Sequence, residues 1–575
     1  MAIYSRIPNR DALPFQDFTS TQLTTNGEIA LAAISPDAKY LASVVDDNGK
    51  SGLWLRHLLT NSDTQVIPPA EGLYINLAFS PDGSYIYFSK ASKSGDGCGL
   101  FRVPVLGGPP QLLVKDIDSN SGFSPGGGLI AFVRVIPEIS IYRLIVANAD
   151  GTEEKIIASR PYSRYPYAVA WSSDGKQIFG IEQSGAWRGS IVSFDVASGQ
   201  VRSLAEFDDL LIDNITPTLD EQKFMVLYRS KSSGFRTRQI GVVSLSDSKL
   251  RAVTRDTNNY GTMTLSGDRK TLAAVQEKTD SALYLLPATS YGVNAPQQIL
   301  TRQNDISDFS WASNTEVYVA RRGSLFRSSV DGSSNIQLIA DPHSTISHVA
   351  GCVSGRFAVF TWDGHGDSHN AQSLWRVEGD GSSQKQIASG NYDDQFVCSP
   401  DGKWIYYAEL NSSGIVQVSA DGGTRQTVIG TVLPGFSNTL GGPDVSSNGK
   451  LLAFNVYGAT PSDPEVVDEE IIVSLDSAAE PRTRMILRGD SIRGGSRFTP
   501  DGNALVYAAY VDNGSYYNGL WFQPLEGSQG HPIVHFPSGW TLRIQFSPDG
   551  QHLGVLRTTH TESDIVLLHD IGNAP

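Results

Sequence analysis

The sequence predicts an all-β protein made of two consecutive six-bladed β-propellers, because a turn motif recurs, its spacing is regular, and two short strands lack a unit of their own. The turn is clearest at Ser80-Pro81-Asp82-Gly83, where segments rich in β-forming residues lie on both sides. Proline presets φ, aspartate bonds the local backbone, and glycine takes a positive φ, so the chain folds back as a hairpin.

This turn recurs along the whole chain, in intact or altered form. A period of about 40–50 residues with four short strands per unit is typical of propeller blades. In the second unit we expect strands at residues 75–79, 85–90, 99–104 and 111–114. The first residues of the turns lie 42 to 53 positions apart and mark twelve four-stranded blades, at Ser35, Ser80, Ser124, Ser172, Thr218, Ser266, Ala312, Ser354, Ser399, Ser446, Thr499 and Ser547.

The two ends of the chain predict how the blades are divided. The last unit stops after its third expected strand, residues 564–569, and two short segments, Thr21–Thr24 and Gln298–Thr301, belong to no unit. We predict that Thr21–Thr24 closes the sixth blade and Gln298–Thr301 the twelfth, so that each propeller is closed by its own N-terminal strand. The expected domains are an N-terminal extension (1–17), a first propeller (18–290), a linker (291–297) and a second propeller (298–575). A seven-plus-five division is the alternative.

The composition excludes several classes of protein. The 575 residues include 45 basic and 60 acidic ones, and the resulting charge of −15 disfavours binding to nucleic acid or to an anionic membrane. No apolar run approaches the roughly 20 residues of a membrane span, and residues 1–10 hold no apolar signal-peptide core. The three cysteines, which have no C-x-x-C spacing, predict neither a disulfide framework nor a zinc site. We interpret Cys352 and Cys398 as small core residues.

Motifs for catalysis and metal binding are not apparent in the sequence. It has no G-x-S-x-G motif, and its nearest string, residues 489–494, lacks the second glycine in the required place. His365, Asp367 and His369 are of types that zinc or copper accepts. A glycine-rich loop does not preorganise them, so we interpret this segment as a solvated loop. We therefore expect no metal and no cofactor, and we predict binding rather than catalysis.

The longer connections, from the second to the third strand and from the fourth strand to the next blade, lie on one face, which is the candidate binding surface. Aromatic residues precede several first strands, and basic residues end several second strands of the first propeller. The alternative is that these aromatic residues cap the blade cores. The second propeller instead carries Glu465, Asp468, Glu469 and Glu470. Because aromatic side chains anchor many ligands, we expect the first propeller to bind a peptide or an acidic or sugar-like ligand. The predicted residues are Tyr74, Lys90, Arg134, Tyr162, Tyr165, Tyr167, Arg229, Tyr260, Tyr392 and Trp540.

The repeat resembles the WD40-like, TolB-type propeller repeat. The N-terminal half is also similar to the region that follows the membrane span in large bacterial serine/threonine protein kinases with a C-terminal propeller. That similarity lies in residues 14–16, 33–37, 53–56, 63–69 and 104–108.

This resemblance implies the sensory or binding part of a receptor, on the extracytoplasmic side. It implies no phosphoryl transfer by this chain, because the sequence has no glycine-rich kinase loop, His-Arg-Asp or Asp-Phe-Gly motif. Two alternatives are a TolB-type protein-interaction scaffold, and a hydrolase or lyase with its active site in a propeller channel.

Overall fold

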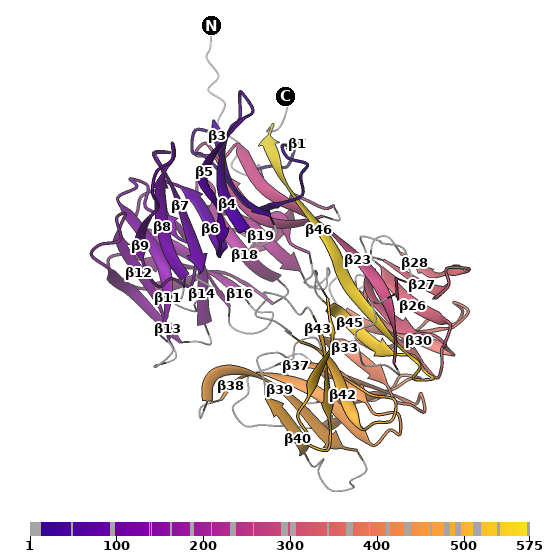
Figure 1. The fold of residues 1–575 in the computed structure, drawn as a ribbon. Coiled ribbons are helices and arrows are strands. Elements are labelled where there is room, and N and C mark those ends of the chain that lie inside the picture. Colours follow the sequence, from indigo (N-terminus) through magenta and orange to yellow (C-terminus); the bar gives the residue numbers. More distant parts are fainter. Residues whose placement is uncertain are drawn as a thin grey trace. The chain divides into compact units, whose positions relative to one another are not determined.

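The computed structural model describes residues 13–571, apart from 48–49, 92–97, 137–138, 140, 162–163, 184–188, 209, 231–236, 257, 289–296, 299–305, 322, 342–343, 364–371, 390–391, 410–414, 430–438, 461–462, 476–482, 489–495, 510–518 and 537–540. The described elements are β-strands (Figure 1). None of the described residues forms a helix long and apolar enough to cross a membrane. The chain forms two compact units. Unit 1 comprises residues 1–231, 235–278 and 562–575, and unit 2 comprises residues 232–234 and 279–561.

Unit 1 contains a series of four-stranded antiparallel sheets, each formed by consecutive strands. The first strand of each sheet is innermost, since β2 contacts β6 and β22, and β14 contacts β10 and β18. The sheets are β2 (Ile29–Ile34), β3 (Tyr40–Asp47), β4 (Lys50–His57) and β5 (Ser62–Glu71); β6 (Leu73–Phe79), β7 (Tyr85–Ala91), β8 (Cys98–Pro104) and β9 (Gln111–Val114); β10 (Gly122–Phe123), β11 (Leu129–Ile136), β12 (Ile141–Asn148) and β13 (Lys155–Pro161); β14 (Tyr165–Trp171), β15 (Gln177–Gln183), β16 (Gly189–Asp195) and β17 (Val201–Phe207); and β18 (Leu210–Pro217), β19 (Lys223–Ser230), β20 (Gln239–Ser244) and β21 (Lys249–Ala252).

Unit 2 repeats this organisation, and its first strands also contact one another in order. The apolar core lies between successive sheets, as in the cluster that joins Val359 and Leu374 to Ile405 and Val418. The sheets are β25 (Ile306–Trp311), β26 (Glu316–Arg321), β27 (Ser324–Ser329) and β28 (Asn335–Ala340); β29 (Thr345–Cys352), β30 (Phe357–Asp363), β31 (Gln372–Glu378) and β32 (Lys385–Ser389); β33 (Tyr392–Cys398), β34 (Trp404–Glu409), β35 (Ile415–Ser419) and β36 (Gln426–Ile429); β37 (Thr439–Val445), β38 (Leu451–Thr460), β39 (Asp463–Ser474) and β40 (Thr483–Arg488); and β41 (Ser496–Phe498), β42 (Ala504–Ala509), β43 (Gly519–Pro524) and β44 (His531–His535).

The recurring turn joins the first and second strands, and its side chains satisfy its own backbone. The Ser80 hydroxyl donates to Oδ1 of Asp82 and accepts a bond of 2.9 Å from the Tyr85 amide. The Asp82 carboxylate also accepts from the Ser84 amide at 3.0 Å, and Gly83 has a φ of 73°. These hydrogen bonds, led by the one from Ser80, lower the pKa of Asp82. The turn is therefore a folding signal, as the sequence predicts.

One further sheet has six strands and contains segments of both units. Its main order is β1 (Phe18–Gln22), β46 (His552–Asp570), β23 (Thr271–Pro287) and β22 (Asn259–Leu265). Two more strands complete it, because β45 (Thr541–Phe546) pairs with β46, and β24 (Gln297–Gln298) pairs with β23. The long strands β23 and β46 each begin in one unit and end in the other. Unit 1 therefore contains the C-terminal part of β46, and unit 2 the C-terminal part of β23 (Figure 1).

This exchange corrects the expected pairing at the ends of the chain. The edge strand β1 pairs with residues 566–570 of β46, rather than with a third strand formed by the residues that follow β22. Likewise, Gln297 and Gln298 pair with Leu285 and Tyr284 of β23, not with residues 564–569. The compact units also differ from the expected ranges 18–290 and 298–575 at residues 279–290 and 562–575. Residues 276–281 and 558–563, where β23 and β46 pass from one unit to the other, contain no glycine or proline, so no strong turn-forming residue interrupts these strands.

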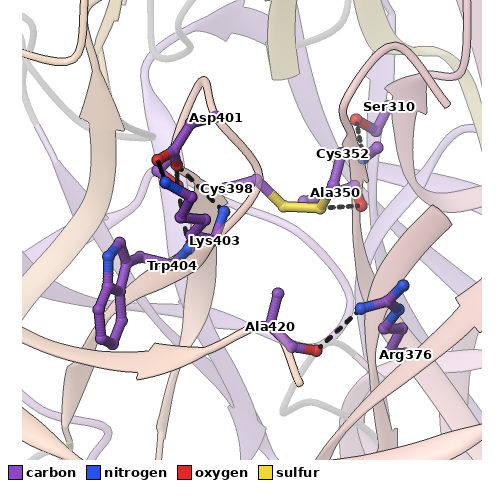
Figure 2. Close-up of a disulfide and its surroundings, with 11 residues drawn as sticks. Ser310, Ala350, Cys352, Arg376, Cys398, Asp401, Lys403, Trp404 and Ala420 are labelled. Carbon is purple, nitrogen blue, oxygen red and sulfur yellow. Dashed lines mark hydrogen bonds and ion pairs between the residues drawn. A yellow bond between two sulfur atoms is a disulfide. The ribbon is translucent and has the colours of Figure 1, made fainter. Parts of the chain in front are cut away.

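A disulfide joins Cys352, the last residue of β29, to Cys398, the last residue of β33 (Figure 2). The two Cα atoms are 5.7 Å apart, within the range that a disulfide spans. Both cysteines do pack in the core, as expected. The prediction that they are unlinked is wrong, because two positions 46 residues apart in sequence become neighbours only when adjacent sheets pack.

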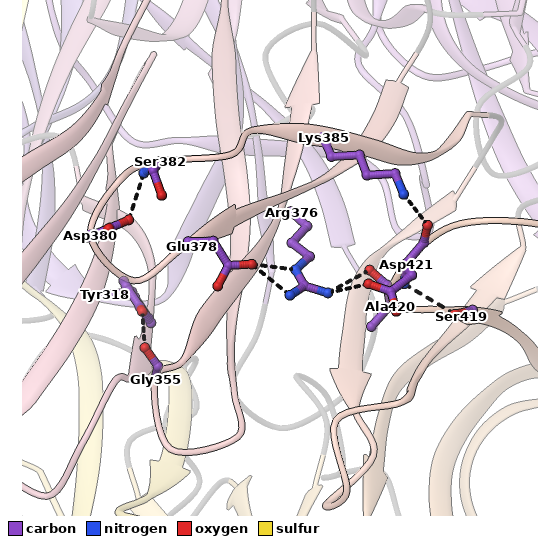
Figure 3. Close-up of polar contacts among 10 residues, drawn as sticks. All are labelled: Tyr318, Gly355, Arg376, Glu378, Asp380, Ser382, Lys385, Ser419, Ala420 and Asp421. Carbon is purple, nitrogen blue, oxygen red and sulfur yellow. Dashed lines mark hydrogen bonds and ion pairs between the residues drawn. The ribbon is translucent and has the colours of Figure 1, made fainter.

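The same two sheets are joined a second time by Arg376 of β31 (Figure 3). Its guanidinium binds Glu378 on its own strand at 2.7 Å and Asp421, in the turn after β35, also at 2.7 Å. The guanidinium also lies 3.9 Å from the ring centre of Phe357, and Lys385 donates to the Asp421 carbonyl. The disulfide and this ion-pair network therefore both fix β29–β32 against β33–β36.

We predict that residues 1–290 alone form a less stable unit than the same fragment supplied with residues 558–575 through a flexible linker. The reason is that the shorter fragment lacks the strand that lies between β1 and β23. Thermal unfolding followed by circular dichroism compares the two, and a scrambled 558–575 segment is the control. Equal melting temperatures would mean that residues 279–287 fold back and replace the missing strand.

We also predict that replacing both Cys352 and Cys398 by serine lowers the free energy of unfolding of unit 2 by about 2–4 kcal/mol, the usual value for a loop of this length. Denaturant titration of the full chain, monitored in unit 2, measures the change. Cys98, which lies outside the disulfide, provides the matched control as Cys98→Ser. A loss no larger than that of the control would argue against a structural role for the bond.

Candidate binding surfaces

A β-bulge interrupts the innermost strand in sheet after sheet, and it changes which side chains are exposed. In β6, the pair Ile75–Asn76 stands opposite the single residue Ser89 of β7. Both members of the pair are partly exposed, while Tyr74 and Leu77 on either side are buried. A bulge breaks the alternation of a strand and re-aims the side chains at that point. At this bulge two neighbouring side chains are therefore partly exposed.

Four bulge pairs of this kind lie among the described residues of unit 1. In each one, the residue before the pair and the residue after it are buried. These pairs lie on the first strands of their sheets, most of which contact one another in order around unit 1. The pairs are Ala30–Leu31 in β2, Ile75–Asn76 in β6, Asp213–Asn214 in β18 and Gly261–Thr262 in β22.

We define the inner surface of unit 1 by Leu31, Ile75, Asn76, Asn214 and Thr262. Within the described part of the chain, the side-chain amides of Asn76 and Asn214 make no hydrogen bond, and the Thr262 hydroxyl has no partner. Polar groups in a folded protein are normally paired with protein, ligand or ordered water. Because the Thr262 hydroxyl is buried, the inner surface of unit 1 offers the two unused side-chain amides, which carry no charge.

The corresponding positions of unit 2 carry charges that pair with one another. Arg543 of β45 lies 3.3 Å from Asp308 of β25 and donates to Gln395 of β33 at 3.0 Å. The strands next to β45 are β25 and β41, so Arg543 reaches past its neighbours to a strand elsewhere in the ring. Its exposed fraction is 8%. Arg543 therefore fills the interior of unit 2 at this level.

Buried carboxylates complete this charged cluster, which we define as Asp308, Asp444, Glu470, Arg497 and Arg543. Glu470 of β39 is 0% exposed, and its Oε1 accepts a hydrogen bond from the Ser496 hydroxyl. Its Oε2 has no hydrogen bond among the described residues. Burial raises the pKa of Glu470 to about 8, and burial also raises the pKa of Asp444. Burial, followed by the charge of Arg543, lowers the pKa of Arg497 to about 10.

The predicted aromatic residues that are described belong to the core rather than to a binding rim. Tyr74 is 4% exposed and packs against Phe88, and Tyr260 is 2% exposed. The hydroxyl of Tyr260 donates to Asp256, and that of Tyr167 donates to the carbonyl of Ile212. Tyr74, Tyr167 and Tyr260 therefore fit the alternative interpretation, in which the aromatic residues cap the blade cores. Tyr74 and Tyr260 also directly precede a bulge pair.

The predicted basic residues are engaged by neighbouring side chains. Arg134 makes a two-fold ion pair with Glu154. Arg229 makes another with Asp213, at 2.7 and 2.9 Å. The Lys90 amine lies 4.8 Å from the ring centre of Tyr74, and burial lowers the pKa of Lys90. An acidic ligand would have to compete with these internal partners.

Several predicted residues lie outside the described part of the structure. Tyr162, Trp540 and the candidate metal ligands His365, Asp367 and His369 are among them. Tyr165 and Tyr392 begin strands β14 and β33, but their side chains are not described. These predictions remain untested.

The bulge pairs were not predicted from the sequence. The available signal is two polar residues in succession between apolar residues, as in Ile212-Asp213-Asn214-Ile215. Such a break in alternation is typical of a bulge rather than of a regular strand.

Comparisons with known proteins were made by sequence and by structure. No family model and no curated protein matches the chain. The similar solved structures include a tricorn protease, at 16% identity over 87% of this chain and 49% of the other, with a TM-score of 0.33. A putative TolB from Agrobacterium tumefaciens matches at 16% identity over 41% of this chain and 89% of the other, with a TM-score of 0.34. The GH74 enzyme of Niastella koreensis matches at 12% identity over 95% and 91%, with a TM-score of 0.34. The chain thus covers about half the length of the tricorn protease.

We predict that Glu470→Gln flattens the pH dependence of the stability of unit 2. With a pKa raised to about 8 in the folded state, Glu470 keeps its proton while the unfolded chain loses it near pH 4.5. Wild-type stability should therefore fall as pH rises from about 5 to about 8, and the amide removes this loss. Chemical denaturation across this range measures the effect, with exposed Glu526→Gln as the control. Parallel curves for wild type and Glu470→Gln would show that Glu470 is ionised in the fold.

Proposed function

We propose that this chain is a non-catalytic binding module, built as two six-bladed propellers, in which the inner surface of unit 1 binds a peptide segment of a partner protein. In this proposal the sixth blade of each propeller is completed by the strand exchange between β23 and β46. The observation that carries the proposed function is the pair of unused amides, Asn76 and Asn214, on separate innermost strands.

The chemistry of these residues supports a peptide ligand. An asparagine amide supplies both a donor and an acceptor, as a peptide group does, so the two can pair reciprocally. The charged groups nearby are already compensated, since Arg229 and Arg238 both contact Asp213. A neutral ligand is therefore favoured over the acidic one that the sequence analysis allowed, because it leaves these ion pairs intact.

The interior of unit 2 supports a different role. Its charged cluster is closed by contacts among its own members, and Arg543 spans part of the ring. We assign this cluster to the stability of unit 2 rather than to ligand binding.

The disulfide supports a location outside the reducing cytoplasm. Together with the resemblance to receptor-kinase propellers, it leads us to propose an extracytoplasmic sensory or protein-binding role. A TolB-type scaffold would use the same binding surface, but its protein partner would be bound constitutively. A hydrolase or lyase activity would instead require turnover of a peptide or glycan by the isolated chain.

We predict that the double variant Asn76→Ala/Asn214→Ala weakens peptide binding at least tenfold without changing the melting temperature by more than about 2 °C. Loss of two hydrogen bonds, each worth about 1 kcal/mol, accounts for the affinity. The melting temperature is kept because neither amide bonds within the described fold. The experiment selects peptides from a displayed 12-residue library with the full chain, then measures affinity by fluorescence anisotropy.

Gln65→Ala provides the matched control, since it removes an exposed amide from the outer strand β5 of the same unit. Equal affinity of the double variant and the control would reject the inner surface of unit 1 as the binding site. Cleavage of the selected peptides during the assay would reject the non-catalytic proposal.

A further inference from the structure

The bulge pairs of unit 1 divide its inner surface into an apolar side and a polar side. On the apolar side, β2 presents Ala30 and Leu31, and the adjacent strand β6 presents Ile75. The exposed fraction of Ile75 is 49%, and that of Leu73 at the start of the same strand is 56%. On the polar side, β18 and β22 present Asn214 and Thr262.

The β-bulge in the backbone of β6 keeps the Ile75 side chain exposed. The core positions on either side are occupied by Tyr74, at 4% exposure, and Leu77, also at 4%. The bulge then directs Ile75 to the same side as Asn76. An aliphatic side chain thus lies beside an unused amide on a single strand.

We propose that the ligand of unit 1 is a peptide with an aliphatic side chain that packs on Leu31, Leu73 and Ile75, while its backbone bonds Asn76 and Asn214. This inference rests on the proposed function and specifies its ligand class. Burial of half-exposed aliphatic surface supplies affinity, and the two amides fix the position of the peptide backbone.

Charge and chemistry select this ligand over the alternatives. An acidic side chain would have to compete with Asp213 for the guanidinium of Arg229. A basic one would meet Asp213, whose carboxylate is already held by Arg229 and Arg238. A neutral glycan could bond the amides but would leave the aliphatic side without a complementary group.

The test uses the full chain and the peptides selected from the 12-residue library. Each bound peptide is resynthesised with its leucine, isoleucine or valine residues replaced one at a time by serine. For wild-type protein we expect one such replacement to weaken binding roughly tenfold. For Leu73→Ser/Ile75→Ser, the same replacement should cost less than twofold, because the protein side of the contact is already absent.

Leu106→Ser is the control, since Leu106 is 84% exposed in the turn after β8 of the same sheet. If the serine double variant unfolds, Ile75→Thr provides the same comparison with a β-branched residue. Peptides that bind wild type without any aliphatic preference would overturn this inference and leave the proposed function standing. Binding to a panel of neutral glycans, with no peptide bound, would overturn both.

Discussion

Closure of each ring of sheets is the constraint on which the rest of this structure depends. A four-stranded sheet has two edges, and the innermost edges are covered because the first strands pack against one another around the unit. The sheet at the point of closure has no consecutive fourth strand, so it takes β1 or β24 from the start of its own unit. Distant parts of the chain must therefore meet before either unit is complete.

The exchange of β23 and β46 makes the two units depend on each other through the covalent chain. Each of these strands supplies one segment to each unit, so neither unit corresponds to one continuous stretch of sequence. Contacts between residues so far apart in sequence lose chain entropy when the loop closes. This loss is offset only when the sheets have packed against one another.

The bulges show how a repeated scaffold acquires different inner surfaces. The same irregularity recurs in innermost strands, yet its two residues are Ile75–Asn76 in β6 and Ser307–Asp308 in β25. In unit 1 these positions leave amides unused, and in unit 2 they build buried ion pairs that stabilise the ring.

The sequence by itself determined the blades, because turn chemistry and strand alternation are local properties. The strands of the second blade, the Ser80 turn and the two orphan closing strands were predicted from such local signals. Only the tertiary structure decided the partners of β1 and β24, the Cys352–Cys398 bond and the pairing of Arg376 with Asp421. Each of these joins residues through the packing of neighbouring sheets or of chain ends, and a local pattern contains no information on such distances. Tyr74 was predicted to lie on the binding rim, but it packs in the core. The bulge next to it leaves Ile75 and Asn76 partly exposed instead.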